Sequence, residues 1–334
     1  MAYTTGTATD YKALLIALRD YIISVPAGSN WVTERDTSGG APDQYEMIFK
    51  GDGGATDEIF WGVETYYDTG AGRHNWRVRG FTGFNTLETF DNQPGTSDDT
   101  YVPLQNASMD YWFYVTGRRV CAVIKTGSAY QFLYAGFIDQ YSDPDEYPYP
   151  MLIMGSASVS TTVFNSNLLH YSSSLNPGSF DNTQTCAYLR DLSGFWMPVS
   201  NFKGTSSEIR FIVTDNIISV WPMSDMSAAS PWEDTYDLAN LFCSSTQGGT
   251  PATLIMRSAN SAGTPVVPLI SNCLLNHMPV EQIYGEIHNL YWCGLSDGVS
   301  AEDTVTDGVS ADVFTVFNNI HRTDPWCGLA IKQE

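Results

Sequence analysis

The sequence is poor in charge, and most of the charge it carries is negative. Only 16% of its 334 residues are charged, and 37 aspartates and glutamates outnumber 16 lysines and arginines, giving a formal net charge of −21. A chain this acidic repels the phosphates of nucleic acids and anionic bacterial surfaces. We therefore predict no nucleic-acid partner.

Long hydrophobic runs and a leader peptide are also missing. No apolar stretch approaches the roughly 18 residues of a membrane-spanning helix, and the opening residues MAYTTGTATD lack the basic start of a signal peptide. We predict no membrane span and synthesis in a cytoplasm.

Catalytic and metal-binding motifs are absent as well. The six cysteines contain no CxxC pair, and the five histidines are dispersed, which argues against a zinc ribbon or a redox dithiol. The chain has no GxSxG, HExxH, Walker A or EF-hand pattern. We predict no catalytic residue, no cofactor and no metal, and interpret most cysteines as buried small hydrophobes. A metal site at His288 with His277 and one disulfide among the late cysteines are the open alternatives.

Aromatic residues and turn clusters are abundant. Aromatics reach 13%, and short β-like runs separated by glycine-rich turns predict a meander or sandwich. Residues 110–137 predict three strands with turns at Thr116-Gly117 and Gly127-Ser128. The one helix signal comes early, with Thr7 or Thr9 as the N-cap, Asp10 in the first turn and a 3.6-residue apolar period over Tyr11, Leu14, Leu15, Leu18 and Ile22.

The predicted fold class is mainly β, with antiparallel sandwich or barrel-like sheets and one N-terminal α-helix. A stretch rich in Ser, Thr and Asn at residues 155–185 predicts a domain boundary near residue 175. Residues 1–175 would form the helix plus a β domain, and residues 176–334 a second β domain.

Three groups of side chains are candidates for chemistry. The arginines at 73, 77 and 79 predict ion pairs with surrounding acids, with a small positive patch as the alternative. The tryptophans predict core packing, with stacking on sugar rings as the alternative; these are Trp61, Trp76, Trp112, Trp196 and Trp292. The carboxylates predict a solvated acidic loop, with a hard cation site or a glycan hydrolase using Asp145 or Glu146 as the alternatives; these are Asp139, Asp143, Asp145 and Glu146.

The segment YAGFIDQYSDPDEYPYPMLIMGS at 134–156 combines prolines, tyrosines and acids. Because proline fixes φ and biases the preceding residue toward extended geometry, we predict a rigid connector. It leaves a strand ending near Phe137 and delivers Met151–Met154 into the core or onto a neighbour. In "GRR" at 117–119 we expect exposed bases in a hairpin turn. The predicted interface candidates are Tyr141, Tyr147, Pro148, Tyr149, Pro150, Arg118, Arg119 and Trp326.

Several stretches resemble a group of virion structural proteins of tailed bacteriophages. They are TGTATDY before a leucine-rich helix, DTSGG, EIFWGVETYYD, GFTGF followed by Phe90 and QPG, MDYWFYVTGRR, YAGFIDQYSDPDEYPYP and the C-terminal FTVFNNIHRTDPWCGLAIKQE. The resemblance covers residues 1–156 and about the last 50 residues, and it carries over no catalytic residue.

The resemblance implies a non-enzymatic subunit of a virion, in the tail, baseplate or neck. Its expected partners are other copies of itself in ring symmetry and other virion proteins, and its expected localisation is the virion. A host-surface carbohydrate-binding tail module is the alternative, and a glycan hydrolase ranks below it.

Overall fold

The computed structural model describes two compact units of the chain. Unit 1 contains the described residues up to Ile138, then 145–156 and 187–198, and unit 2 contains 139–144 and those from Val199 onward. The described residues are 2–25, 30–40, 44–53, 58–70, 72–141, 143–148, 150–156, 187–190, 194–200, 209–214, 270–277, 282–293, 300–306, 311–318 and 328–333.

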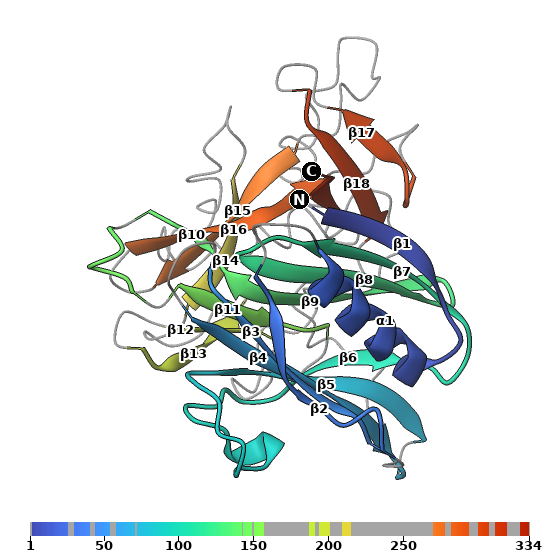
Figure 1. Cartoon of the computed structure of the whole chain (residues 1–334). Coiled ribbons are helices and arrows are strands. Elements are labelled where there is room, and N and C mark those ends of the chain that lie inside the picture. The colour runs from blue at the N-terminus through green and yellow to red at the C-terminus, as the bar shows by residue number, and fades with distance from the viewer. Residues whose placement is uncertain are drawn as a thin grey trace. The chain divides into compact units, whose positions relative to one another are not determined.

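Unit 1 holds two antiparallel sheets (Figure 1). Sheet A has the order β1-β7-β8-β9-β11-β12-β13, and its strands are Ala2–Ala8, Met109–Val115, Arg119–Thr126, Ala129–Phe137, Met151–Met154, Ala187–Arg190 and Trp196–Ser200. Sheet B has the order β2-β3-β4-β5-β6, and its strands are Val32–Asp36, Glu46–Gly51, Ile59–Asp68, Arg73–Phe81 and Thr100–Leu104. A short 3-10 helix, η1 (Phe90–Asn92), lies in the connection between β5 and β6.

The predicted helix is α1 (Tyr11–Ser24), and its five periodic apolar side chains are all buried. Its N-cap differs from the prediction. Asp10 lies one residue before the helix, and its Oδ1 accepts hydrogen bonds from the backbone N–H groups of Lys12 and Ala13 at 2.9 and 2.8 Å. Thr7 cannot serve, because it lies in β1 and donates to Asp110 at 2.7 Å. The carboxylate of Asp10 therefore satisfies the first free amides of the helix.

Strand β1 was not predicted from its polar sequence. Its seven residues pair antiparallel with β7 in unbroken register, from Ala2 opposite Val115 to Ala8 opposite Met109. Tyr3 packs on Tyr114 with ring centroids 4.9 Å apart. Pairing with a strand more than a hundred residues away stabilises β1, so its own residues carry little signal.

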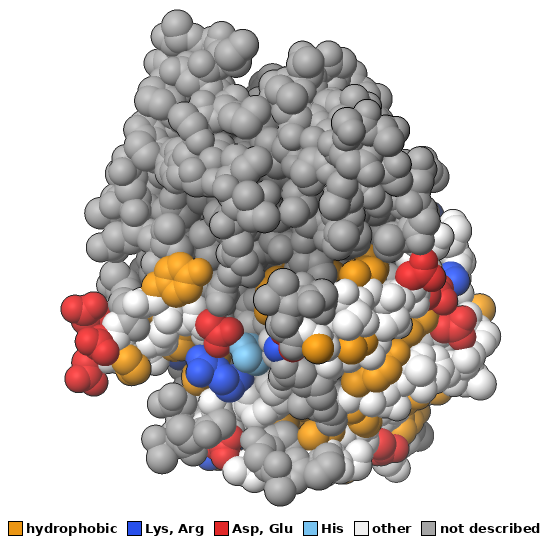
Figure 2. All heavy atoms as spheres, turned by 90° about the horizontal axis from the view of Figure 1, so that it is seen from above, with side chains coloured by type: hydrophobic (Ala, Val, Ile, Leu, Met, Phe, Trp, Pro, Cys, Tyr) orange, Lys and Arg blue, Asp and Glu red, His pale blue; other side chains and the backbone are white. Residues whose placement is uncertain are grey.

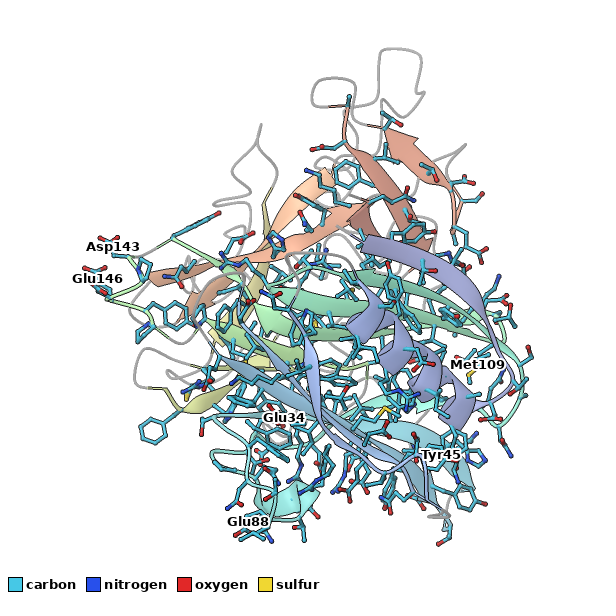
Figure 3. The ribbon with its side chains drawn as sticks, viewed as in Figure 1. Glu34, Tyr45, Glu88, Met109, Asp143 and Glu146 are labelled. Carbon is cyan, nitrogen blue, oxygen red and sulfur yellow. The ribbon has the colours of Figure 1, made fainter. Side chains whose placement is uncertain are left out.

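The meander predicted over residues 110–137 is confirmed. Strands β7, β8 and β9 pair in succession, with turns at the two predicted dipeptides. The segment after β9 also behaves as predicted at its end, because β11 pairs antiparallel with β9 and all four of its side chains are buried. The residues Pro144–Glu146 form a turn, and the side chain of Glu146 is exposed (Figure 3).

The inner faces of sheets A and B enclose the core of unit 1 together with α1. Trp61 stacks on Phe49 with ring centroids 4.9 Å apart, and the indole N–H of Trp76 donates to the carbonyl of Tyr11 at 2.9 Å. All four side chains are buried. The sandwich therefore has a dense aromatic interior, and α1 contacts both sheets.

Unit 2 contains a third antiparallel sheet, sheet C. Its order is β14-β15-β16-β19-β18-β17, and β10 (Asp139–Gln140) pairs with β16 beside this path. The strands of sheet C are Ile209–Thr214, Ile270–His277, Gln282–Cys293, Gly328–Gln333, Val313–Asn318 and Thr304–Thr306. A small core of Phe314, Val316 and Ala330 is packed against Tyr291 and Val305.

The predicted fold class is confirmed: the described residues are mainly β, with antiparallel sheets and one α-helix, which lies near the N-terminus. The domain boundary predicted near residue 175 lies outside the described residues and stays a prediction. On the face of the molecule in Figure 2, acidic side chains lie at both edges of the described surface, and another lies beside a group of basic side chains and a histidine.

Candidate functional site

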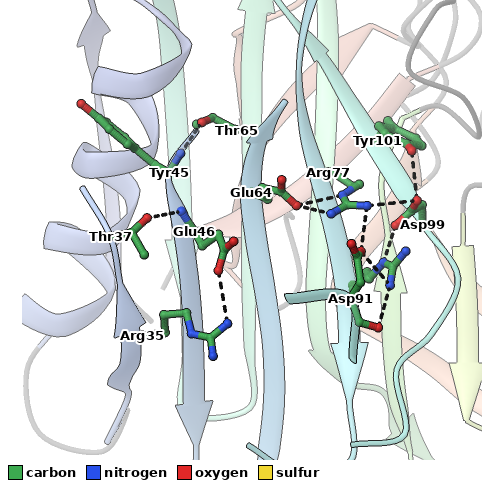
Figure 4. A network of polar contacts seen from close by, with 11 residues as sticks. Arg35, Thr37, Tyr45, Glu46, Glu64, Thr65, Arg77, Asp91, Asp99 and Tyr101 are labelled. Atoms are coloured by element: carbon green, nitrogen blue, oxygen red, sulfur yellow. Dashed lines mark hydrogen bonds and ion pairs between the residues drawn. The ribbon is translucent and has the colours of Figure 1, made fainter. Parts of the chain in front are cut away.

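The outer face of sheet B, which points away from the core, carries a row of ionisable side chains (Figure 4). Strand register places Glu46 opposite Glu64, Glu64 opposite Arg77, and Arg77 opposite Tyr101. Arg35 extends the row onto β2, where its guanidinium lies 3.2 Å from the carboxylate of Glu46. The row thus crosses all five strands. We call it the ionic row.

The connection between β5 and β6 adds two more carboxylates. Arg77 donates two hydrogen bonds to Oε2 of Glu64, the one from Nε at 3.0 Å, and its Nη1 lies 2.9 Å from Asp91 and 3.7 Å from Asp99. Arg79 bridges the same two acids, 3.2 Å from Asp91 and hydrogen-bonded to Asp99. Two arginines therefore hold three carboxylates together, one on β4 and two on the connection.

Burial sets the proton affinities in this row. The Glu64 side chain is only 5% exposed, and burial raises the pKa of its carboxyl although the ion pair with Arg77 acts in the opposite direction. Burial acts to lower the pKa of Arg77, but the charges of Glu64, Asp99 and Asp91 raise it above its usual value. Burial also raises the pKa of Tyr101, which donates to Asp99 at 3.0 Å. The guanidinium therefore stays charged and the phenol neutral.

A second set of contacts fixes the connection at residues 82–99, which we call the outer loop. Phe90 is buried against Phe81 in an edge-on contact with centroids 5.5 Å apart, within a cluster that includes Ile48 and Phe60 of sheet B. A Cβ on Gly62 would lie 2.7 Å from the ring of Phe90. Only glycine at this position lets the ring approach the sheet so closely.

The side chain of Gln93 stabilises the outer loop through hydrogen bonds to its backbone. Its side chain is 2% exposed; its Oε1 accepts from the N–H of Asn85 at 2.9 Å, and its Nε2 lies 3.0 to 3.1 Å from the carbonyls of Asn85, Glu88 and Thr89. A single buried amide thus ties together both ends of the segment from Asn85 to Gln93. Such side chain–backbone bonds replace the strand ladder that a loop lacks.

The tip of the outer loop is solvent-exposed but held. Asn85 accepts a hydrogen bond from the N–H of Leu87 at 3.0 Å, which is an Asx turn. Arg35 of the ionic row donates to the carbonyl of Glu88, and Figure 3 shows Glu88 at the outer end of the loop. Leu87 itself is 91% exposed. The ionic row and the outer loop are therefore connected through Arg35, Arg77 and Arg79. The ion pairs of the row hold the backbone of the outer loop in place.

Sequence reasoning found part of this site. The prediction that the arginine cluster pairs with acids is confirmed for Arg77 and Arg79, while Arg73 is exposed at the start of β5, opposite Asp68. The spacing of 77 and 79 places both on one face of a strand. The partners Glu64, Asp91 and Asp99 were missed, because no local pattern shows which of 37 acids face a given strand.

The predicted interface candidates differ in solvent exposure. Tyr141 is 55% exposed, and Pro148 is exposed. Tyr147 is fully buried within unit 1 and donates its hydroxyl to the carbonyl of Arg190. Pro150 is buried too, and its carbonyl accepts from the N–H of Ile138 at 2.8 Å. Tyr149 and Trp326 lie outside the described residues.

The expectation of exposed bases at "GRR" is wrong for Arg119. Its side chain is fully buried, and its guanidinium lies 5.9 Å from the centroid of the Tyr134 ring, a cation–π distance. It also hydrogen-bonds to Cys121, although burial has the larger effect and raises the pKa of that thiol to about 11. Arg118 is half-buried and donates to the carbonyl of Ile138 at 3.1 Å. Arg119 is therefore an internal side chain of unit 1.

The clustered carboxylates at residues 139–146 have different surroundings. Asp143, Asp145 and Glu146 are exposed. Asp139 is half-buried and lies 2.5 Å from Nδ1 of His288, whose Nε2 lies 3.0 Å from the amide nitrogen of Asn289. Among the described residues, no group of three or more His, Cys, Asp and Glu side chains is arranged to hold a metal ion. The side chain of His277 lies outside that set, so the predicted pairing with His288 stays untested.

The tryptophan and cysteine predictions hold where they can be followed. Trp61, Trp76 and Trp112 are buried, and Trp196 is half-buried with its indole N–H donating to the carbonyl of Gly95 at 2.7 Å. Cys121 is buried as a free thiol. The side chain of Trp292 and the side chains of the other five cysteines lie outside the described part of the structure.

The chain matches no protein-family model and no curated protein. Within its described residues, no helix has both the length and the apolar character needed to cross a membrane.

Proposed function

We propose that the protein is a non-enzymatic structural subunit of a tailed-phage virion, in the tail, baseplate or neck. It would act by symmetric self-assembly and by contacts to other virion proteins. The observation that supports this proposal is the use of charge on the outer face of sheet B. There, the ionic row and a buried glutamine hold an exposed loop in one conformation.

A subunit that works by shape benefits from such a loop. Ordering a flexible loop during association costs roughly 0.5–1.5 kcal/mol for each side chain that becomes fixed. In this chain the ordering is already achieved in the isolated fold. The stretches that carry the phage resemblance also supply part of this structure, since EIFWGVETYYD contains Glu64 and the segment from GFTGF to QPG covers the outer loop up to residue 95.

Composition supports the same proposal. The acidic surface keeps unassembled copies apart and soluble through mutual repulsion, and the tyrosine-rich and tryptophan-rich composition is typical of protein interfaces. Quantitative mass spectrometry of purified particles tests it. The chain should be present at a fixed copy number, and its consistent absence from particles would overturn the proposal.

A host-surface carbohydrate-binding module is a second candidate, favoured by a column of three rings. Tyr67 is 48% exposed and stacks on His74 with centroids 4.6 Å apart, and His74 packs on Tyr11 at the same distance. A tyrosine backed in this way offers a rigid apolar face to a sugar ring. A glycan array tests it: binding by the wild type that is lost in Tyr67→Ala supports a sugar site, and no binding to host polysaccharide removes it.

A further inference from the structure

We propose that Leu87 is the anchor by which the outer loop docks onto a different protein, one that offers an apolar pocket rimmed by lysine and arginine side chains. The inference rests on the proposed function as a particle subunit. It names a contact residue and the chemistry of the surface that receives it.

Leu87 is the first reason for the assignment. It is the most exposed of the large hydrophobic side chains in the described residues, at 91%, whereas the other exposed ones range from 48% to 69%. One exposed leucine alone would mean little. This one, however, stands on a loop whose backbone is held on both sides of it, by Asn85 and by Arg35 through the carbonyl of Glu88.

The arrangement of the loop's own apolar residues is the second reason. Phe90 turns inward and is 2% exposed, and Phe84 packs against the same cluster. Leu87 lies three residues from each of them and points to solvent. A loop that needed apolar contacts only for its own stability would gain nothing from this side chain. An exposed, preorganised leucine instead suits insertion into a pocket, because association then costs little ordering entropy.

The negative charge of the outer loop indicates which kind of partner surface it fits. The outer loop from Thr82 to Asp99 contains four acids and no lysine, arginine or histidine. Glu88 follows Leu87 directly and is exposed, and Asp98 is exposed on the same loop. Asp91, by contrast, is engaged with Arg77 and Arg79. Because each copy of this chain carries a formal net charge of −21, a second copy is a poor match for this acidic rim. A basic rim on another protein is a good one.

The experiment compares variants of the full-length chain in complementation of particles that lack it. Leu87→Ala removes the anchor, Leu87→Met keeps an apolar one, and Ile23→Ala truncates a half-exposed aliphatic side chain on α1. We expect Leu87→Ala to melt like the wild type, because it removes almost no buried contact. Its copy number per particle should fall roughly tenfold or more, as for the loss of a hot-spot side chain. Leu87→Met and Ile23→Ala should incorporate normally.

Glu88→Lys tests the charged rim independently of the leucine, and it should also reduce incorporation. Normal incorporation of both Leu87→Ala and Glu88→Lys overturns the docking proposal while leaving the proposed function intact. Failure to find the wild-type chain in particles overturns the proposed function itself. If Leu87→Ala instead weakens self-association of the purified chain in sedimentation velocity, the pocket belongs to a second copy and the assigned partner is wrong.

Discussion

The two faces of sheet B are built from alternate residues of the same strands, yet they are buried by different means. The inner face packs Phe49, Trp61 and Trp76 into the core, where dispersion and the hydrophobic effect dominate. The outer face pairs Glu64 with Arg77 and covers the pair with the outer loop. The inner face therefore gains its stability mainly from packing. The outer face also has an apolar cluster around Phe90, but its ion pairs stabilise it only while every charge keeps its partner.

This difference has a physical origin. Apolar contacts are individually weak and tolerate substitution by side chains of similar volume. A buried carboxylate has already lost its hydration, so its energy depends on one or two specific neighbours. The loss of unfolding free energy should therefore scale with the volume removed for substitutions on the inner face. On the outer face it should depend on whether a charge is left without a partner.

The largest effect is expected from Trp61→Ala on the inner face. The side chain is fully buried and stacked on Phe49, so its removal leaves a large cavity. We expect a loss of about 3–5 kcal/mol in the free energy of unfolding, the usual range for this change. Urea denaturation followed by tyrosine and tryptophan fluorescence measures it. A loss below about 1 kcal/mol would mean that the core of unit 1 is not packed around this ring.

Arg77→Ala should cost nearly as much on the outer face, about 3 kcal/mol, because Glu64 is left buried without its counter-ion. The double variant Glu64→Leu, Arg77→Met removes both charges at similar volume and should recover most of that loss. Recovery distinguishes a lost charge partner from lost packing. If the double variant is as unstable as Arg77→Ala, the charges of the row are not what makes the single change costly.

The sequence predicted the core of unit 1 better than the outer face of sheet B. Alternation and turn dipeptides are local signals, and they placed β7, β8 and β9 of sheet A correctly. The predicted core packing of Trp61 and Trp76 on sheet B is also confirmed. The sequence EIFWGVETYYD alternates from Ile59 to Tyr67, which is typical of a strand with one exposed face, yet residues 59–65 are all buried. The reason lies in the outer loop, which follows β5 and reaches back over β4. Local periodicity cannot show which segment covers a sheet.

Arg119 and Leu87 illustrate the same limit in opposite directions. The arginine follows a turn and reads as exposed, but the ring of Tyr134, fifteen positions later, receives it. The leucine stands in the polar segment NTLETF and carries no signal of its own. Only the positions of Asn85, Arg35 and Gln93 around it indicate that its exposure is a fixed property of the fold.

Two buried tryptophans on the inner face separate the effect of one hydrogen bond from the effect of side-chain volume. The indole N–H of Trp76 donates to the carbonyl of Tyr11 at 2.9 Å, whereas that of Trp61 has no hydrogen-bond acceptor among the described residues. Both rings are fully buried. Trp76→Phe should therefore cost about 1 kcal/mol more than Trp61→Phe, the net worth of one buried hydrogen bond. Equal losses in urea denaturation would show that volume alone governs this face.

The smallest expected effect is the pH dependence of stability that Glu64 causes, and it tests the outer face. The folded protein holds the pKa of Glu64 above its ordinary value of 4.5, so between these two values the folded state binds a proton that the unfolded chain has released. Stability attributable to this group is complete below the ordinary pKa and declines as pH rises through the raised value. Arg77 opposes the shift, which keeps the effect small.

Wild type should therefore lose stability relative to Glu64→Gln as pH rises from 4 toward 7, measured by urea denaturation at each pH. Because the charge of Glu46 helps to raise the same pKa, Glu46→Gln should shrink the decline. A gain of wild-type stability over Glu64→Gln across this range would mean that the ion pair outweighs burial.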